Sequence, residues 1–81
     1  MKLTKELLES TLKDFDINII EIFELSNDLV AIVGNNEKLP NFTTIPSKFI
    51  ISLLSYKNVE DVEIKGGTYI PMISIRCYIK P

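Results

Sequence analysis

The chain has 81 residues, enough for one domain, and its content of 46% hydrophobic and 25% charged residues is ordinary for a folded globular protein. The formal net charge of −2 does not indicate a nucleic-acid binder. Histidine is absent and Cys77 is the only cysteine, so zinc has almost no ligands and no disulfide can form within the chain. We therefore expect no cofactor and no metal.

A cytoplasmic location is expected from the distribution of apolar residues. No apolar run approaches the roughly 20 residues that are needed to span a bilayer. The charges among the first six residues come too early for the apolar segment of a signal peptide. We therefore expect no membrane partner.

An amphipathic helix of about three turns is predicted directly after Thr4. Thr4 is a favourable N-cap residue, and Glu6 in the first turn interacts well with the helix dipole. We expect Asp16 to end the helix. Residues at helical spacing define its inner side: Leu7, Leu8, Thr11, Leu12 and Phe15.

A β-hairpin is predicted next, from two apolar runs rich in β-branched residues at 17–25 and 29–33. The turn Ser26-Asn27-Asp28 contains Asn and Asp, which accept a left-handed backbone more readily than most residues. The second strand is apolar throughout, which indicates cover on both faces, or cover on one face and a bound partner on the other. In the first strand, alternation places Ile20 and Ile22 on one face, opposite Ile17, Ile19, Glu21, Phe23 and Leu25.

A polar loop at 34–41 leads to a second predicted helix, with Pro46 near its first turn, where proline is tolerated. Ile51 lies off its apolar stripe, so either the helix is buried on two sides or Ile51 is exposed. Asn58 is predicted to take a left-handed conformation after the helix. The stripe consists of Ile45, Phe49, Ile50, Leu53 and Leu54.

A short strand at 59–65, a turn at Gly66-Gly67-Thr68 and a last strand at 69–79 complete the pattern. Pro71 cannot donate a ladder hydrogen bond, so its end of the strand is expected at an edge or a bulge. The order predicts one α+β domain over 1–81: α-β-β-α-β-β, a four-stranded antiparallel sheet with two helices on one face. Circular permutation of a ferredoxin-like chain would give the same order. In the last strand, Ile73, Ile75, Cys77 and Ile79 alternate with Met72, Ser74, Arg76 and Tyr78.

The residues that catalysis usually needs are sparse. Cys77 lies on the apolar side of its strand pattern and is predicted to be a small buried hydrophobe. Glu60 and Asp61 are adjacent carboxylates of a kind that can do acid–base chemistry, but such pairs are more often a solvated strand edge that discourages aggregation. We expect a protein that is not an enzyme and binds no small molecule. Charge is uneven, with a net −5 over residues 1–37 and +3 over residues 38–81.

One segment resembles a known family. Residues 7–17, Leu-Leu-Glu-Ser-Thr-Leu-Lys-Asp-Phe-Asp-Ile, resemble the opening of the alpha domain of FtsK-type DNA translocases, where Leu-x-Asp-Phe-Gly-Val leads into a hairpin. The chain departs from that pattern at Asp16, where glycine is favoured, at 26–28, where Gly-Pro is usual, and at 66–67, where the family has Pro-Gly. The ATPase motor is missing. The resemblance implies an oligomerising module without ATPase activity that lies close to DNA.

Two functions are favoured from the sequence, while a third hypothesis, an enzyme that uses carboxylates only, would require two acids with perturbed pKa values in one pocket. The first is a small non-enzymatic interaction module, such as an inhibitor or adaptor of a phage or mobile element, that binds a protein or itself through an open sheet face or edge. Its candidate contacts are Ile51, Tyr56, Tyr69, Met72, Arg76 and Tyr78. The second is a free-standing translocase-like module that oligomerises and contacts the DNA backbone through Lys48, Lys57, Lys65, Arg76 and Lys80.

Overall fold

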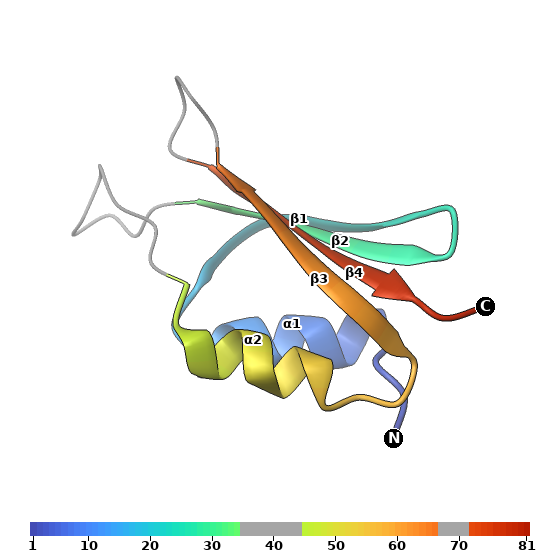
Figure 1. Ribbon diagram of the computed structural model, residues 1–81. Coiled ribbons are helices and arrows are strands. Elements are labelled where there is room, and N and C mark those ends of the chain that lie inside the picture. Colours follow the sequence, from blue (N-terminus) through green and yellow to red (C-terminus); the bar gives the residue numbers. More distant parts are fainter. Residues whose placement is uncertain (35–44, 67–71) are drawn as a thin grey trace.

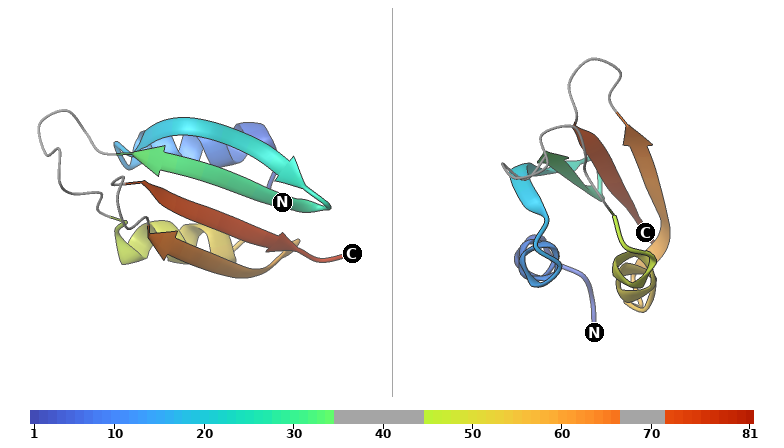
Figure 2. Two further views of the ribbon diagram at one scale, coloured as in Figure 1. Left: turned by 90° about the horizontal axis from the view of Figure 1, so that it is seen from above. Right: turned by 90° about the vertical axis from the view of Figure 1, so that its left-hand side faces the viewer.

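The computed structural model describes residues 1–34, 45–66 and 72–81, which form two helices and a four-stranded antiparallel sheet (Figure 1). Both helices cover the same face of the sheet (Figure 2). The predicted α+β class and element order are confirmed. The elements are α1 (Lys5–Asp14), β1 (Asn18–Leu25), β2 (Asp28–Gly34), α2 (Ser47–Leu54), β3 (Val59–Gly66) and β4 (Ile73–Ile79).

The strands lie in the order β1-β2-β4-β3, and each neighbouring pair is antiparallel. Moving β4 to the front of the chain would give the β-α-β-β-α-β order and the strand arrangement of a ferredoxin-like fold. The arrangement makes β2 and β4 the central strands. The two edges of the sheet are therefore β1 and β3.

The hydrophobic core fills the space between the helices and the covered face of the sheet. α1 packs against β1 and α2 against β3. The rings of Phe15 and Phe49 meet edge to face with their centroids 5.6 Å apart, which joins the ends of the two helices. Residues with no exposed surface come from both helices and both central strands: Leu8, Leu12, Ala31, Val33, Phe49, Leu53, Ile75 and Cys77.

α1 ends in a Schellman motif that turns the chain toward β1. Asp16 has a φ of 57°, in the left-handed region. Its backbone N–H donates to the carbonyl of Lys13 at 3.0 Å, and the N–H of Ile17 donates to the carbonyl of Leu12 at 2.9 Å. Thr4 caps the other end, as predicted. The helix thus ends where the sequence indicated, at a residue whose left-handed backbone conformation is sterically strained.

Replacing Asp16 by glycine is expected to stabilise the protein. Glycine takes the left-handed conformation without a Cβ clash, and we expect the free energy of unfolding to rise by about 0.5–1 kcal/mol. Urea denaturation followed by circular dichroism measures this change. Asp16→Ala is the control, because alanine keeps the Cβ and should give no gain. Equal stability of the glycine and alanine variants would show that the backbone at Asp16 is not strained.

β1 contains a β-bulge that reverses the alternation expected for its first half. Ile19 pairs with Val33 and Glu21 with Ile32, so Ile20 is the extra residue. The bulge lets Ile19 pack against the core, and the next core contact is Ile22. The prediction that Ile20 and Ile22 share a face is therefore wrong.

The side chain of Ile20 lies over Gly34 at the end of β2. A Cβ on Gly34 would come within 2.8 Å of Ile20 Cδ1. Gly34 follows Ile32 by two residues, so this space is on the face of the sheet away from the helices. A glycine at this position makes room for Ile20, which stays 53% exposed.

The turn of the hairpin consists of two residues, Ser26 and Asn27, because Leu25 pairs directly with Asp28. Ser26 has a φ of 56°, as the first central residue of a type II′ turn does. The expectation that Asn or Asp would take this conformation is wrong. Asp28 is instead the first residue of β2, where its side chain reaches Arg76 of the neighbouring β4.

α2 begins after Pro46, which is its N-cap residue. The alternatives for Ile51 are resolved, because this side chain is 65% exposed on the outer side of the helix. Leu54, expected in the apolar stripe, is 46% exposed, because the helix turns it away from the fully buried Leu53.

Asn58 does not take the left-handed conformation that was predicted. Its side chain instead holds the N-terminal segment. Asn58 Oδ1 accepts from the N–H of Leu3 at 2.7 Å, and Asn58 Nδ2 donates to the carbonyl of Leu3 at 3.1 Å. The two hydrogen bonds hold Leu3, which precedes the N-cap of α1, beside the start of β3.

Some predicted features lie outside the described residues. They are the loop at 35–41, the turn residues Gly67 and Thr68, the candidate contact Tyr69, and Pro71 with the first part of the last strand. Gly34, predicted to open the loop, is the last residue of β2.

Candidate functional site

The face of the sheet away from the helices is covered by no element that the structure describes (Figure 2). We call it the open face. Strand register places on it side chains from all four strands: Glu21, Phe23, Leu25, Asp28, Val30, Ile32, Asp61, Glu63, Lys65, Ser74, Arg76 and Tyr78. The open face has an apolar half on β1 and β2 and a polar half on β4 and β3.

The apolar half is a small cluster separate from the hydrophobic core. Val30 is only 4% exposed, yet it does not belong to the core cluster. It lies between Phe23 of β1 and Arg76 of β4, which pair with it on either side. Ile20 and Leu25, near the two ends of β1, are 53% and 45% exposed. We call this cluster the apolar strip, made of Ile20, Phe23, Leu25, Val30 and Ile32.

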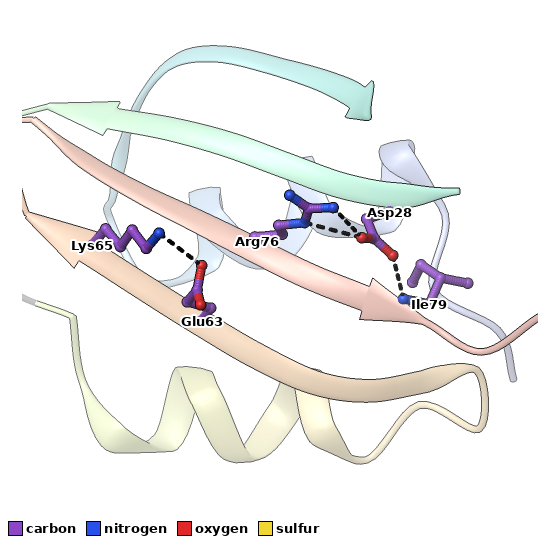
Figure 3. Close-up of polar contacts among 5 residues, drawn as sticks. All are labelled: Asp28, Glu63, Lys65, Arg76 and Ile79. Atoms are coloured by element: carbon purple, nitrogen blue, oxygen red, sulfur yellow. Dashed lines mark hydrogen bonds and ion pairs between the residues drawn. The ribbon is translucent and has the colours of Figure 1, made fainter. Parts of the chain in front are cut away.

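An ion pair crosses the middle of the open face. Asp28 Oδ2 accepts from Arg76 Nη2 at 2.7 Å and from Arg76 Nε at 3.0 Å, and Asp28 Oδ1 accepts from the N–H of Ile79 at 2.9 Å (Figure 3). The Ile79 backbone hydrogen bond, with the Arg76 hydrogen bonds, lowers the pKa of Asp28 below its ordinary 3.8. The guanidinium carbon of Arg76 also lies 4.8 Å from the ring centroid of Tyr78. The pair ties the hairpin turn to β4.

The polar half of the open face is acidic at its outer side. Lys65 Nζ lies 3.5 Å from Glu63 Oε1 in an exposed pair (Figure 3). A shallow depression is lined by Glu60, Asp61, Glu63 and Tyr78. We call Glu60, Asp61 and Glu63 the acidic rim.

The bases and acids of the open face are not balanced. Both bases, Lys65 and Arg76, already have a carboxylate partner. Within the described part of the chain, Glu21, Glu60 and Asp61 have no ion pair. The spare charge of the open face is therefore negative.

The predicted protein-contact residues do not form one surface. Arg76 and Tyr78 lie side by side on the open face, and Met72, half-buried, directly precedes β4. Ile51 is on the outer side of α2, and Tyr56, half-buried against the core, follows the same helix. The structure therefore joins two of the six residues and places Ile51 and Tyr56 in the other layer.

The predicted DNA-contact residues are also divided. Lys65 and Arg76 lie on the open face and are paired with acids. Lys48 is in the first turn of α2, Lys57 follows that helix, and Lys80 lies beyond the end of β4. The described residues thus present no single basic surface that would follow a phosphate backbone.

No metal cluster is found in the described ranges, and the thiol of Cys77 is not activated. No group of three or more Cys, Asp or Glu residues there could hold a metal ion. Cys77 is fully buried, as predicted, and burial raises the pKa of its thiol to about 12. A thiol of this kind stays protonated and does not act as a nucleophile at neutral pH.

Sequence reasoning missed the apolar strip and Asp28. The fully apolar second strand did indicate a surface outside the core, since Val30 and Ile32 alternate with buried Ala31 and Val33. The position of Ile20 depends on the β-bulge, and no residue pattern within β1 predicts that bulge. Asp28 could not be linked to Arg76, 48 residues away, without the strand order.

Comparison with protein-family profiles, curated proteins and solved structures finds no match to this chain. The similarity to the FtsK-type alpha domain therefore stays a hypothesis. Among the residues described, neither helix is long and apolar enough to cross a membrane.

Proposed function

We propose that the protein is a non-enzymatic interaction module that binds a protein partner through the open face. An inhibitor or adaptor role suits a chain of this size, as expected from the sequence. The observation that carries the proposal is the apolar strip, which is packed in its middle and exposed at its ends, on a face that no described element covers. An apolar cluster outside the core, on a sheet face that no described element covers, is a candidate binding surface in a soluble protein.

The surroundings of the apolar strip support a binding role. Tyr78 and Arg76 lie next to it, and both residue types are enriched at the centres of protein interfaces. The ion pair with Asp28 holds Arg76 in one orientation, so its side chain loses little freedom when a partner covers it.

The proposal predicts that lysines on the apolar strip abolish partner binding. Ile20→Lys/Leu25→Lys changes two half-exposed residues, so the fold should persist while a protein captured by the wild-type chain from its native cell extract is lost. The matched control is Ile51→Lys/Leu54→Lys on α2, where the two residues are 65% and 46% exposed. Quantitative mass spectrometry of the captured proteins measures the difference.

The control variant should retain the partner, because it carries the same added charge on the opposite layer. Loss of the partner by the α2 variant, or equal capture by all three chains, would contradict the assignment of the open face. Light scattering on the same chains shows whether the captured partner is a second copy.

A further inference from the structure

We infer that the open face docks a cationic amphipathic α-helix of the partner protein. The apolar side of that helix would lie on the apolar strip, and its Lys or Arg side chains would face the acidic rim. This inference rests on the proposed function and specifies the chemistry of the partner.

The sign of the charge follows from the pairs already formed on the open face. Arg76 and Lys65 are neutralised by Asp28 and Glu63 within the chain. Glu21 on one side and Asp61 on the other are left without a cation from the described residues. A partner that supplies cations would compensate them, whereas an anionic partner would be repelled from both sides.

The spacing of the strands suits an α-helix. The apolar strip and the acidic rim are separated by β4, so β2 and β3 lie about 10 Å apart, close to the diameter of a helix with its side chains. β2 and β4 have seven residues each, about 23 Å, which corresponds to a helix of about 15 residues. A helix lying along these strands would reach both halves of the open face.

A helix also satisfies its own backbone hydrogen bonds, which is required of any segment that packs on a sheet face instead of its edge. A second copy of this chain fits less well. Two open faces in contact would bring Glu21 and the acidic rim of one copy against the same acids of the other. The charge pattern therefore favours a different protein.

The probe for this inference is a designed Leu/Lys peptide that forms an amphipathic helix of about 15 residues. Its affinity for the full chain is measured by isothermal titration calorimetry at low and at high salt. Two matched peptides serve as references: a Leu/Glu helix of the same pattern, and a scrambled Leu/Lys sequence with no apolar side. We expect the Leu/Lys helix to bind at least about tenfold more tightly than either, and to lose several-fold in high salt.

Variants of the chain locate the binding. Two double variants should each lower the affinity for the Leu/Lys helix at least about tenfold: Ile20→Lys/Leu25→Lys and Glu60→Lys/Asp61→Lys. The first places charges on the apolar strip, and the second reverses the charge of the acidic rim. Ile51→Lys/Leu54→Lys and Glu6→Lys/Asp14→Lys carry the same charge changes on the two helices and should bind like the wild type. Circular dichroism confirms that each variant is folded.

Three outcomes overturn the inference. Equal or tighter binding of the Leu/Glu helix reverses the charge assignment, and binding that the open-face variants do not weaken places the peptide elsewhere. No binding of any helix excludes a helical partner of this charge. None of these outcomes decides the proposed function, which depends on whether Ile20→Lys/Leu25→Lys loses the captured protein.

Discussion

Phe49→Ala is expected to lower the free energy of unfolding by about 3–5 kcal/mol, the usual cost of removing a fully buried aromatic side chain. Phe49 has no exposed surface, and its ring meets that of Phe15, so the substitution leaves a cavity between the two helices and the sheet. A domain of this size has a total stability of about 4–12 kcal/mol. The substitution should therefore remove at least about a quarter of the total stability, which urea denaturation followed by circular dichroism measures.

Two controls separate this effect from a general sensitivity of α2. Phe49→Leu keeps an apolar side chain at the site and should cost about 1–2 kcal/mol. Ile51→Ala lies two residues away on the exposed side and should stay within about 0.5 kcal/mol of the wild type. A loss of less than about 1 kcal/mol for Phe49→Ala would show that the helices are not anchored at this point.

The parts of the fold that depend on local pattern could be predicted from the sequence. Thr4 and the helical spacing that follows it define α1, and the alternation of Ile75 and Cys77 with Arg76 and Tyr78 defines the two sides of β4. These signals involve residues within one element, where the period of the apolar residues decides the structure. The element order then limited the fold to few arrangements.

The parts that could not be predicted depend on contacts between distant segments. Asn58 is of a residue type that often ends a helix, but its side-chain amide instead binds the backbone of Leu3, 55 residues away. The bulge at Ile20 is set by how β1 pairs with β2, and it decides which side chains reach the open face. The candidate site is therefore less predictable than the fold, because it combines a bulge, a strand order and an ion pair.

Asp28→Asn is expected to destabilise the protein at neutral pH more than Glu63→Gln does. Asp28 accepts three hydrogen bonds, two of them from Arg76, and only 13% of its side chain is exposed. An asparagine keeps an acceptor for the N–H of Ile79 but leaves the charge of Arg76 without its partner. The Glu63–Lys65 pair is exposed, and its loss should cost within about 0.5 kcal/mol.

The effect of Asp28 has a defined dependence on pH. Its pKa in the folded protein is lowered below the ordinary 3.8, so the folded state holds the proton less tightly than the unfolded state does. The carboxylate therefore stabilises the fold fully at a pH above the ordinary pKa of 3.8, and this contribution is lost as the pH falls through the lowered pKa of the folded state. The stability difference between wild type and Asp28→Asn should shrink below pH 3.8. A difference that stays constant into acid would exclude the ion pair as its cause.

Asp28→Asn should also weaken binding of a cationic helix while the variant is folded. The substitution releases the positive charge of Arg76 in the middle of the open face, between the apolar strip and the acidic rim. A Leu/Lys helix would then meet a like charge where the wild type presents a neutral pair, so its affinity should fall most at low salt. Arg76→Gln in the same background removes that charge and should restore part of the affinity. An affinity that does not recover in the double variant would contradict the released charge of Arg76 as the cause.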